Sequence, residues 1–130
     1  MRRIVLLFSV AVLLEACQES LEQRCAREAR EYTRKNCPAP VAKDVIVDSM
    51  TFDAATHTIG YFYTLSGQLD DTALVARNDM REMLLRELRN SAKLKMYKEA
   101  DYLFRYVYYS KSQKGRKLFE STFRPSDYNE

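Results

Sequence analysis

The sequence predicts one α+β domain, an antiparallel four-stranded sheet covered by helices on one face. Apolar residues recur at helical spacing in two segments, and four other segments are β-branched, aromatic or alternating. These segments follow the order helix, strand, strand, helix, strand, strand. With 130 residues, 46% of them hydrophobic and 30% charged, the chain can build one modest core and is too short for two domains.

The first element is an amphipathic helix over residues 18–36. Its apolar positions are spaced by four, four and three residues, and Arg and Glu fill the other faces. These positions are Leu21, Cys25, Ala29 and Tyr32. Pro38 and Pro40 end the helix, because proline cannot continue the ladder of backbone hydrogen bonds.

A β-hairpin is expected next. Residues 45–52 are β-branched and apolar, residues 53–58 form a polar connection, and residues 59–65 alternate apolar and other side chains. Ile59, Tyr61, Tyr63 and Leu65 therefore share one face of the second strand.

The second half repeats the pattern of one helix and two strands. Apolar residues keep helical spacing over residues 78–95, and Asp79 with Glu82 is placed as a capping box. Residues 102–110 form a strongly aromatic strand. A turn containing Gly115 and a last strand over residues 117–123 follow.

The N-terminus has the organisation of an export signal. Arg2 and Arg3 precede eleven uncharged, mostly apolar residues, 4–14, which are the basic and hydrophobic regions of a signal peptide. A transmembrane helix needs about 20 apolar residues, and Glu15 ends this run too early.

The end of this segment, Leu14-Glu15-Ala16-Cys17, resembles the lipobox of bacterial lipoproteins. The resemblance implies that residues 1–16 are removed, that Cys17 receives acyl chains, and that residues 17–22 are a short tether to a domain over 23–130. Two or more acyl chains make a stable membrane anchor. Gln18, next to the cysteine, favours the outer membrane over the inner.

Cys25 and Cys37 remain as an even pair once Cys17 is lipidated, and an oxidising periplasm favours a disulfide between them. The alternative is a buried thiol at Cys25 with Cys37 free. Bridged Cα atoms lie within about 7 Å of each other, so the chain after the helix would have to fold straight back.

The aromatic strand supplies a candidate binding face. Tyr102, Tyr106 and Tyr108 share one of its sides, and both of its sides are largely apolar. If helices cover one face of the sheet, the other leaves aromatic surface for a partner, since tyrosine is enriched at interfaces. The alternative is that helices or a second copy cover both faces.

Two Tyr-x-Tyr strands, 61–63 and 106–108, with a middle helix and a turn at Gly115, resemble a group of small, exported, uncharacterised bacterial proteins. The resemblance spans roughly residues 36–119. It implies a cystatin-like α+β fold, and it brings no established activity or catalytic residues.

No catalytic or metal-binding constellation stands out, so we expect no enzyme, metal or cofactor. His57, the single histidine, is placed in a hairpin turn without an orienting partner, and Asp70 with Asp71 lacks the spaced ligands of a calcium loop. The net charge is +3, of which the first 16 residues carry +1. Export together with this near-neutral balance argues against nucleic acid as a partner.

The sequence thus favours a lipid-anchored, non-enzymatic module of the periplasm or cell surface that binds an envelope or secreted protein. One alternative is an inhibitor or immunity lipoprotein that acts against a toxin or lytic enzyme. Another is a carrier of a small apolar ligand held between the helices and the sheet.

Overall fold

The computed structural model describes residues 18–77 and 79–129; the predicted signal peptide and Cys17 lie outside them. The helices are α2 (Leu21–Asn36), η1 (Gly67–Leu69, a 3₁₀ turn), α3 (Thr72–Arg77), α4 (Met80–Asn90), α5 (Lys95–Glu99) and α6 (Pro125–Tyr128). The strands are β1 (Ala39–Ala42), β2 (Val45–Asp53), β3 (Thr58–Leu65), β4 (Leu103–Ser110) and β5 (Lys117–Phe123). In this part of the chain no helix is long and apolar enough to span a membrane.

The α+β class is confirmed, but the predicted antiparallel four-stranded sheet is wrong in strand number and orientation. The sheet has five strands in sequential order, and β3 pairs with β4 in parallel, whereas the other three pairs are antiparallel. The segment from β3 to β4 contains η1, α3, α4 and α5. Such a crossover returns the chain to the end of the sheet where β3 began, so β4 runs in the same direction as β3.

The strand missed by the sequence analysis is β1. It is short, contains Pro40 and pairs only with residues 45–47 of β2, with a register shift between Pro40 and Ala42. Proline within a segment argues against a central strand, but it is tolerated at a sheet edge, where its missing N–H faces away from the neighbouring strand.

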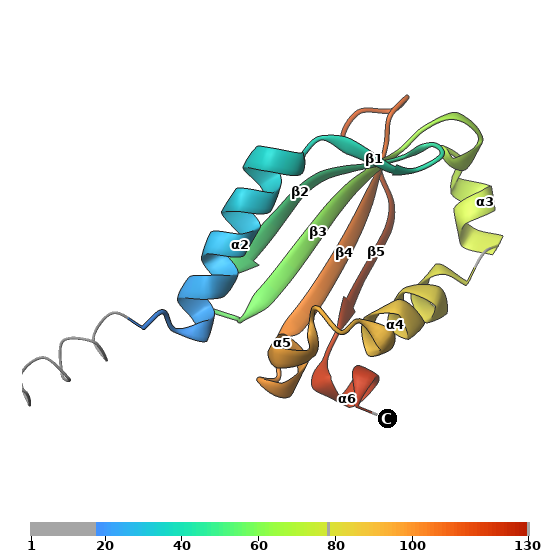
Figure 1. The fold of residues 1–130 in the computed structure, drawn as a ribbon. Coiled ribbons are helices and arrows are strands. Elements are labelled where there is room, and N and C mark those ends of the chain that lie inside the picture. Colours follow the sequence, from blue (N-terminus) through green and yellow to red (C-terminus); the bar gives the residue numbers. More distant parts are fainter. Residues whose placement is uncertain (1–17, 78, 130) are drawn as a thin grey trace, which may run out of the picture.

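The single helix predicted over residues 78–95 is divided. Asp79 caps α4, accepting a hydrogen bond from the backbone N–H of Glu82 at 3.3 Å, but α4 ends at Asn90 and α5 begins at Lys95. The helices lie against one face of the sheet. Helix α2 lies along β2, and α3 to α6 lie around the β4–β5 half (Figure 1).

Helix α2 begins at a full capping box. The Ser20 hydroxyl accepts from the Gln23 backbone N–H at 3.1 Å, and the Gln23 side chain accepts from the Ser20 N–H at 3.0 Å. The helix covers part of β2 that β1 leaves unpaired. There, the Thr33 hydroxyl donates to the Met50 carbonyl and accepts from the Met50 N–H, both at 2.9 Å. The Thr33 side chain thus supplies the hydrogen bonds that the backbone at this free edge of the sheet would otherwise lack.

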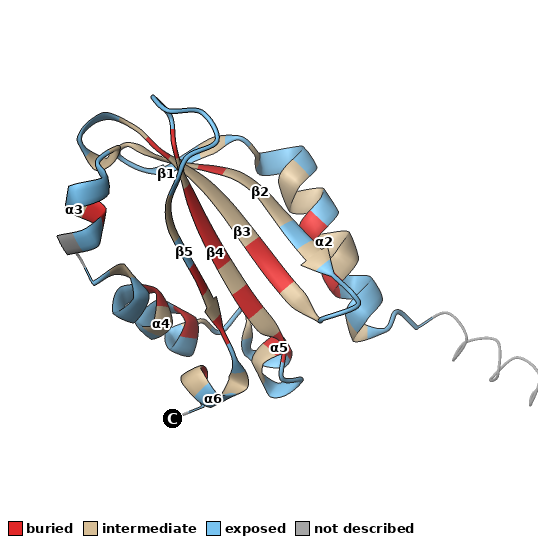
Figure 2. Cartoon of the chain, turned by 180° about the vertical axis from the view of Figure 1, so that it is seen from behind, coloured by how far each residue is buried: buried red, intermediate tan, exposed pale blue. Residues whose placement is uncertain are grey.

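The core lies between these helices and the sheet. Its largest fully buried side chains are Tyr97, Phe104, Phe123, Ile59 and Leu88. Buried residues are concentrated along β4, which has neighbours on both sides (Figure 2). Phe104 and Phe123 occupy paired positions of β4 and β5. The core is therefore built mainly against the second half of the sheet.

The disulfide predicted between Cys25 and Cys37 is absent; both cysteines are free. Helix α2 continues unbroken from Cys25 to Asn36, so Cys37 lies about 18 Å further along the helix axis at 1.5 Å per residue. A disulfide requires Cα atoms within about 7 Å. Proline ends the helix only at a point where the helix has already taken the chain away from Cys25.

The two thiols differ in environment, which predicts different reactivity. Cys25 is fully buried and burial raises its thiol pKa to about 12; the Cys37 thiol is partly exposed and its pKa is raised less. In a Cys17→Ser chain at pH 8, we expect a thiol-reactive reagent to label Cys37 slowly and Cys25 only after unfolding, because the thiolate is the reactive form. Mass spectrometry of native and urea-unfolded samples measures the labelling of each cysteine. If neither cysteine could be labelled in unfolded samples kept without reductant, the two would be joined in a disulfide and the prediction would be contradicted.

Candidate binding groove

Four tyrosines form a square on the helix-covered face of the sheet, and we call them the tyrosine floor. In the parallel register Tyr61 pairs with Tyr106 and Tyr63 with Tyr108. Each pair is stacked, with ring centroids 5.2 Å and 4.6 Å apart. Alternation along a strand places residues two apart on one face, so the four rings lie side by side.

The helices leave the middle of this face partly open. Tyr61 and Tyr63 lie on β3, the central strand, yet both are only partly buried. Tyr106 and Tyr108 are 8% and 7% exposed. A central strand under a continuous helical layer would be closed to solvent, so the helices leave part of this face uncovered. Two hollows lie there, one lined by Tyr108 and the other by Tyr61, and we call them together the groove.

The floor is polar at its hydroxyls but uncharged. Loss of hydration raises the pKa of Tyr63 to about 12 and also raises the pKa of Tyr61, Tyr106 and Tyr108; neighbouring tyrosines add to this effect. In the described part of the chain, no hydrogen bond involves any of the four hydroxyls. Each can therefore donate to or accept from a bound molecule.

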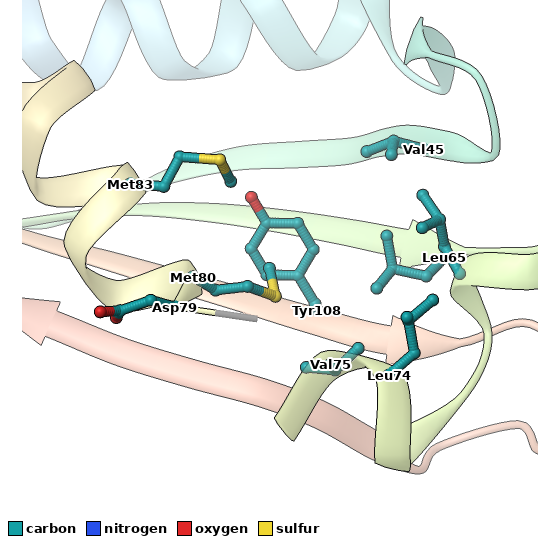
Figure 3. Close-up of a pocket in the computed structure, with 9 residues that line it drawn as sticks. Val45, Leu65, Leu74, Val75, Asp79, Met80, Met83 and Tyr108 are labelled. Carbon is teal, nitrogen blue, oxygen red and sulfur yellow. The ribbon is translucent and has the colours of Figure 1, made fainter. Parts of the chain in front are cut away.

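One end of the groove deepens into an apolar hollow of about 470 Å³ between α3, α4 and the sheet. Tyr108 points into it from the floor, with Met80 and Met83 on its α4 side (Figure 3). Apart from Asp79, the rest of the wall is aliphatic and comprises Val45, Leu65, Leu69, Leu74 and Val75. Met83 keeps 50% of its surface exposed. This hollow suits an apolar group, because methionine side chains adapt to varied shapes.

The other end opens between α2 and α5, in a hollow of about 490 Å³. Tyr61 and Met50 contribute from the sheet, Tyr32 from α2 and Leu94 from the segment before α5. Charged residues of both signs stand around this apolar base: Glu28, Glu31, Lys35 and Lys93. The groove as a whole therefore has an apolar, tyrosine-rich floor, and charged residues line this end of it.

The three tyrosines predicted as an exposed binding face do not form one. All are buried on the helix-covered side, and Tyr102 is only 2% exposed. Its ring stacks on His57 at 4.9 Å and on Phe52 at 5.6 Å, which places it in the core. Tyr106 and Tyr108 belong to the tyrosine floor. Their side of β4 faces inward because the crossover places the helices there.

Chemical groups outside the groove have structural partners. His57 Nε2 lies 2.8 Å from Glu22 Oε1 and links the β2–β3 turn to the start of α2. Asp70 accepts hydrogen bonds from the Ser110 hydroxyl and the Ser112 N–H, which hold the pKa of its carboxyl below the usual value. Within residues 18–77 and 79–129, no three His, Cys, Asp or Glu side chains gather closely enough to hold a metal ion.

Sequence analysis did not single out Tyr61, Tyr63, Met80 or Met83 as site residues. The alternation over residues 59–65 placed Tyr61 and Tyr63 on one face, and helical spacing placed the methionines on an apolar stripe. The missing step was the parallel pairing of β3 with β4. It brings two Tyr-x-Tyr segments together on one face.

A family model described as "Domain of unknown function (DUF8479)" matches residues 20–119. This chain belongs to that family. The matched region of the DUF8479 domain runs from the N-cap of α2 into β5 and contains the tyrosine floor and both hollows. No curated protein matches the sequence.

Two solved structures share the fold of this DUF8479 member. One is a protein of Pseudomonas aeruginosa described as a "putative secreted protein", with a TM-score of 0.65 and 8% identity over 85% of this chain and 99% of its own. The other is a pilotin from the type 2 secretion system of Vibrio vulnificus, with a TM-score of 0.59 and 10% identity over 83% of this chain and 91% of its own. At these identities the likeness establishes the fold alone.

Proposed function

We propose that this chain is a non-enzymatic adaptor of the bacterial envelope, anchored through lipid on Cys17, that binds an apolar segment of an envelope protein in its groove. The observation that carries the proposal is the groove itself. Tyr61 and Tyr108 of the tyrosine floor line its two hollows, their hydroxyls have no hydrogen-bond partner in the described part of the chain, and one hollow is apolar and lies beside the exposed Met83.

The lining matches the chemistry of protein interfaces. Tyrosine and methionine are enriched where proteins bind one another, because tyrosine combines a stiff apolar ring with a polar tip and methionine adapts its shape. The carboxylates that line the groove have structural partners, since Asp79 caps α4, Glu28 pairs with Arg24 and Glu31 pairs with Arg27. The tyrosines of the floor stay protonated at neutral pH. The geometry therefore favours binding.

The envelope setting is supported by two further observations. The lipobox-like Leu14-Glu15-Ala16-Cys17 supplies an anchor, and Gln18 favours the outer membrane. The fold is shared with a protein described as secreted and with a pilotin of a secretion system. An adaptor for an envelope protein is consistent with both relatives.

The substitution Met83→Ser tests whether the partner binds in the groove. We expect cross-linking and pull-down from native membranes to capture one abundant envelope protein, and Met83→Ser to weaken its binding about tenfold or more. An exposed methionine beside an apolar hollow is placed to bury a partner group, and a few such residues carry most of the energy of an interface. The dissociation constant for the captured protein is measured by calorimetry.

Met96→Ser is the matched control. Met96 is 37% exposed, lies on α5 and lines neither hollow, so this variant should bind within about twofold of the wild type. Equal binding by both methionine variants would place the interface outside the groove. A folded, membrane-bound protein that captures no specific partner would contradict the adaptor proposal.

A small apolar ligand is the second candidate, because the hollow between α3 and α4 has a volume suited to one. Native mass spectrometry distinguishes the two. A bound apolar molecule of fixed mass, lost in Met83→Ser and kept in Met96→Ser, would favour a carrier over an adaptor.

A further inference from the structure

Helix α2 carries an arginine ridge, formed by Arg27, Arg30 and Arg34, on its outer side, where Arg30 and Arg34 also border a hollow against residues 49–52 of β2. At 100° per residue these three positions lie roughly 140° to 200° around the helix axis from the buried Cys25. Gln23 is the other helical residue on this arc, and the nearest carboxylates, Glu19 and Glu31, lie at the Arg27 end of the ridge. The ridge extends over about 10 Å from Arg27 to Arg34.

Two of the three arginines have free guanidinium groups. Arg30 and Arg34 are exposed, and in the described part of the chain neither takes part in an ion pair or hydrogen bond. Arg27 is paired, with Glu19 at 2.9 Å and with Glu31 at 3.4 Å. A ridge of one sign with unpaired members attracts an anionic surface, whereas paired surface charges contribute little.

The ridge lies close to the predicted membrane anchor. Ser20, the N-cap of α2, follows Cys17 by three residues, which span at most about 11 Å when fully extended. The start of α2 therefore lies near the headgroups whenever Cys17 is lipidated. This tether favours lipid as the anionic partner over an acidic protein that would have to diffuse to the ridge.

We infer that the arginine ridge is a contact surface for anionic lipid headgroups, on which α2 lies once Cys17 has inserted its acyl chains. The inference rests on the anchor of the proposed function and adds an orientation to it. Each arginine close to an anionic leaflet strengthens the contact by about fivefold, so the two free arginines favour the docked orientation on the order of 25-fold. The groove, on the sheet side of α2, is then turned away from the lipid.

Arginine modification tests this in the mature lipidated protein. The protein is placed on vesicles of phosphatidylcholine alone or of phosphatidylcholine with about one third phosphatidylglycerol, and treated with phenylglyoxal. Mass spectrometry then follows each arginine. We expect Arg30 and Arg34 to react about fivefold more slowly on the anionic vesicles, and this protection to fall at about 0.5 M salt, where the Debye length is a few ångströms.

Arg86 is the internal control, because it is exposed on α4 and no ion pair involves it in the described chain. Its rate should be the same on both vesicles. Flotation of the protein with the vesicles tests the anchor separately. A protein that floats with neither kind of vesicle lacks the anchor. A protein that floats with both, but whose Arg30 and Arg34 react at the same rate on both kinds of vesicle, as Arg86 does, overturns the lipid contact of the ridge alone. Protection by added polyglutamate but not by anionic vesicles would overturn it in favour of an acidic protein partner.

Discussion

Phe104→Ala is expected to lower the free energy of unfolding by about 3–5 kcal/mol, the range found when a buried phenylalanine is truncated. Phe104 has no exposed surface, packs edge to face against Tyr128 at 5.7 Å, and pairs with Ile59 and Phe123 in the register of the sheet. Its removal leaves a cavity bounded by rigid strands, which relax little. Since domains of this size are stable by about 5–15 kcal/mol, urea unfolding should show a large shift in midpoint.

Phe62→Ala is the matched control on the neighbouring strand. Phe62 lies on the opposite face of the sheet, is partly exposed and has Arg105 above its ring at 5.6 Å. The same truncation there should cost less than half as much, because the site stays open to water and leaves no closed cavity. Equal losses in the two variants would show that the core is not concentrated on the helix-covered face.

Thr33→Val is expected to cost about 2 kcal/mol, a large effect for a change that keeps the shape of the side chain. The Thr33 hydroxyl accepts from the N–H and donates to the carbonyl of Met50 on the outer side of β2, beyond the residues that pair with β1. Valine removes both hydrogen bonds and leaves two partly buried backbone groups without a partner, which costs about 1–3 kcal/mol. Urea unfolding measures the loss, and hydrogen exchange of the Met50 amide should speed up in parallel.

Thr33→Ser separates this hydrogen bonding from packing. Serine retains the hydroxyl and lacks only a methyl group, so we expect a loss of about 1 kcal/mol or less. A loss as great as that of Thr33→Val would assign the role of Thr33 to its methyl group, and the edge of β2 would then have no special dependence on α2.

Local patterns predicted where most elements lie. The spacing of Leu21, Cys25 and Ala29 predicted α2, and proline ended that helix where the sequence analysis placed its end. The strands over residues 45–52, 59–65, 102–110 and 117–123 are confirmed to within a residue at each end. These signals succeed because they depend on neighbours within one turn or one strand.

Pairings between distant segments were not predictable in the same way. The chain from β3 to β4 is a helical crossover, and nothing in the local pattern tells whether such a connection returns to the same end of the sheet or the opposite one. The disulfide prediction failed because it required the chain to fold straight back after the helix. Cys37 instead follows the last residue of α2, so the length of the helix separates it from Cys25.

The sequence by itself determined the α+β class and predicted an export signal with a lipobox-like end, because each depends on residue types at short spacing. Tertiary structure alone decided that Tyr61, Tyr63, Tyr106 and Tyr108 form one floor, that this floor faces the helices, and that they leave it partly open. Strand pairing and helix placement follow from how the whole chain buries its apolar surface. Paired residues of this floor, such as Tyr61 and Tyr106, are 45 positions apart in the sequence, so the site exists only once β3 and β4 have paired.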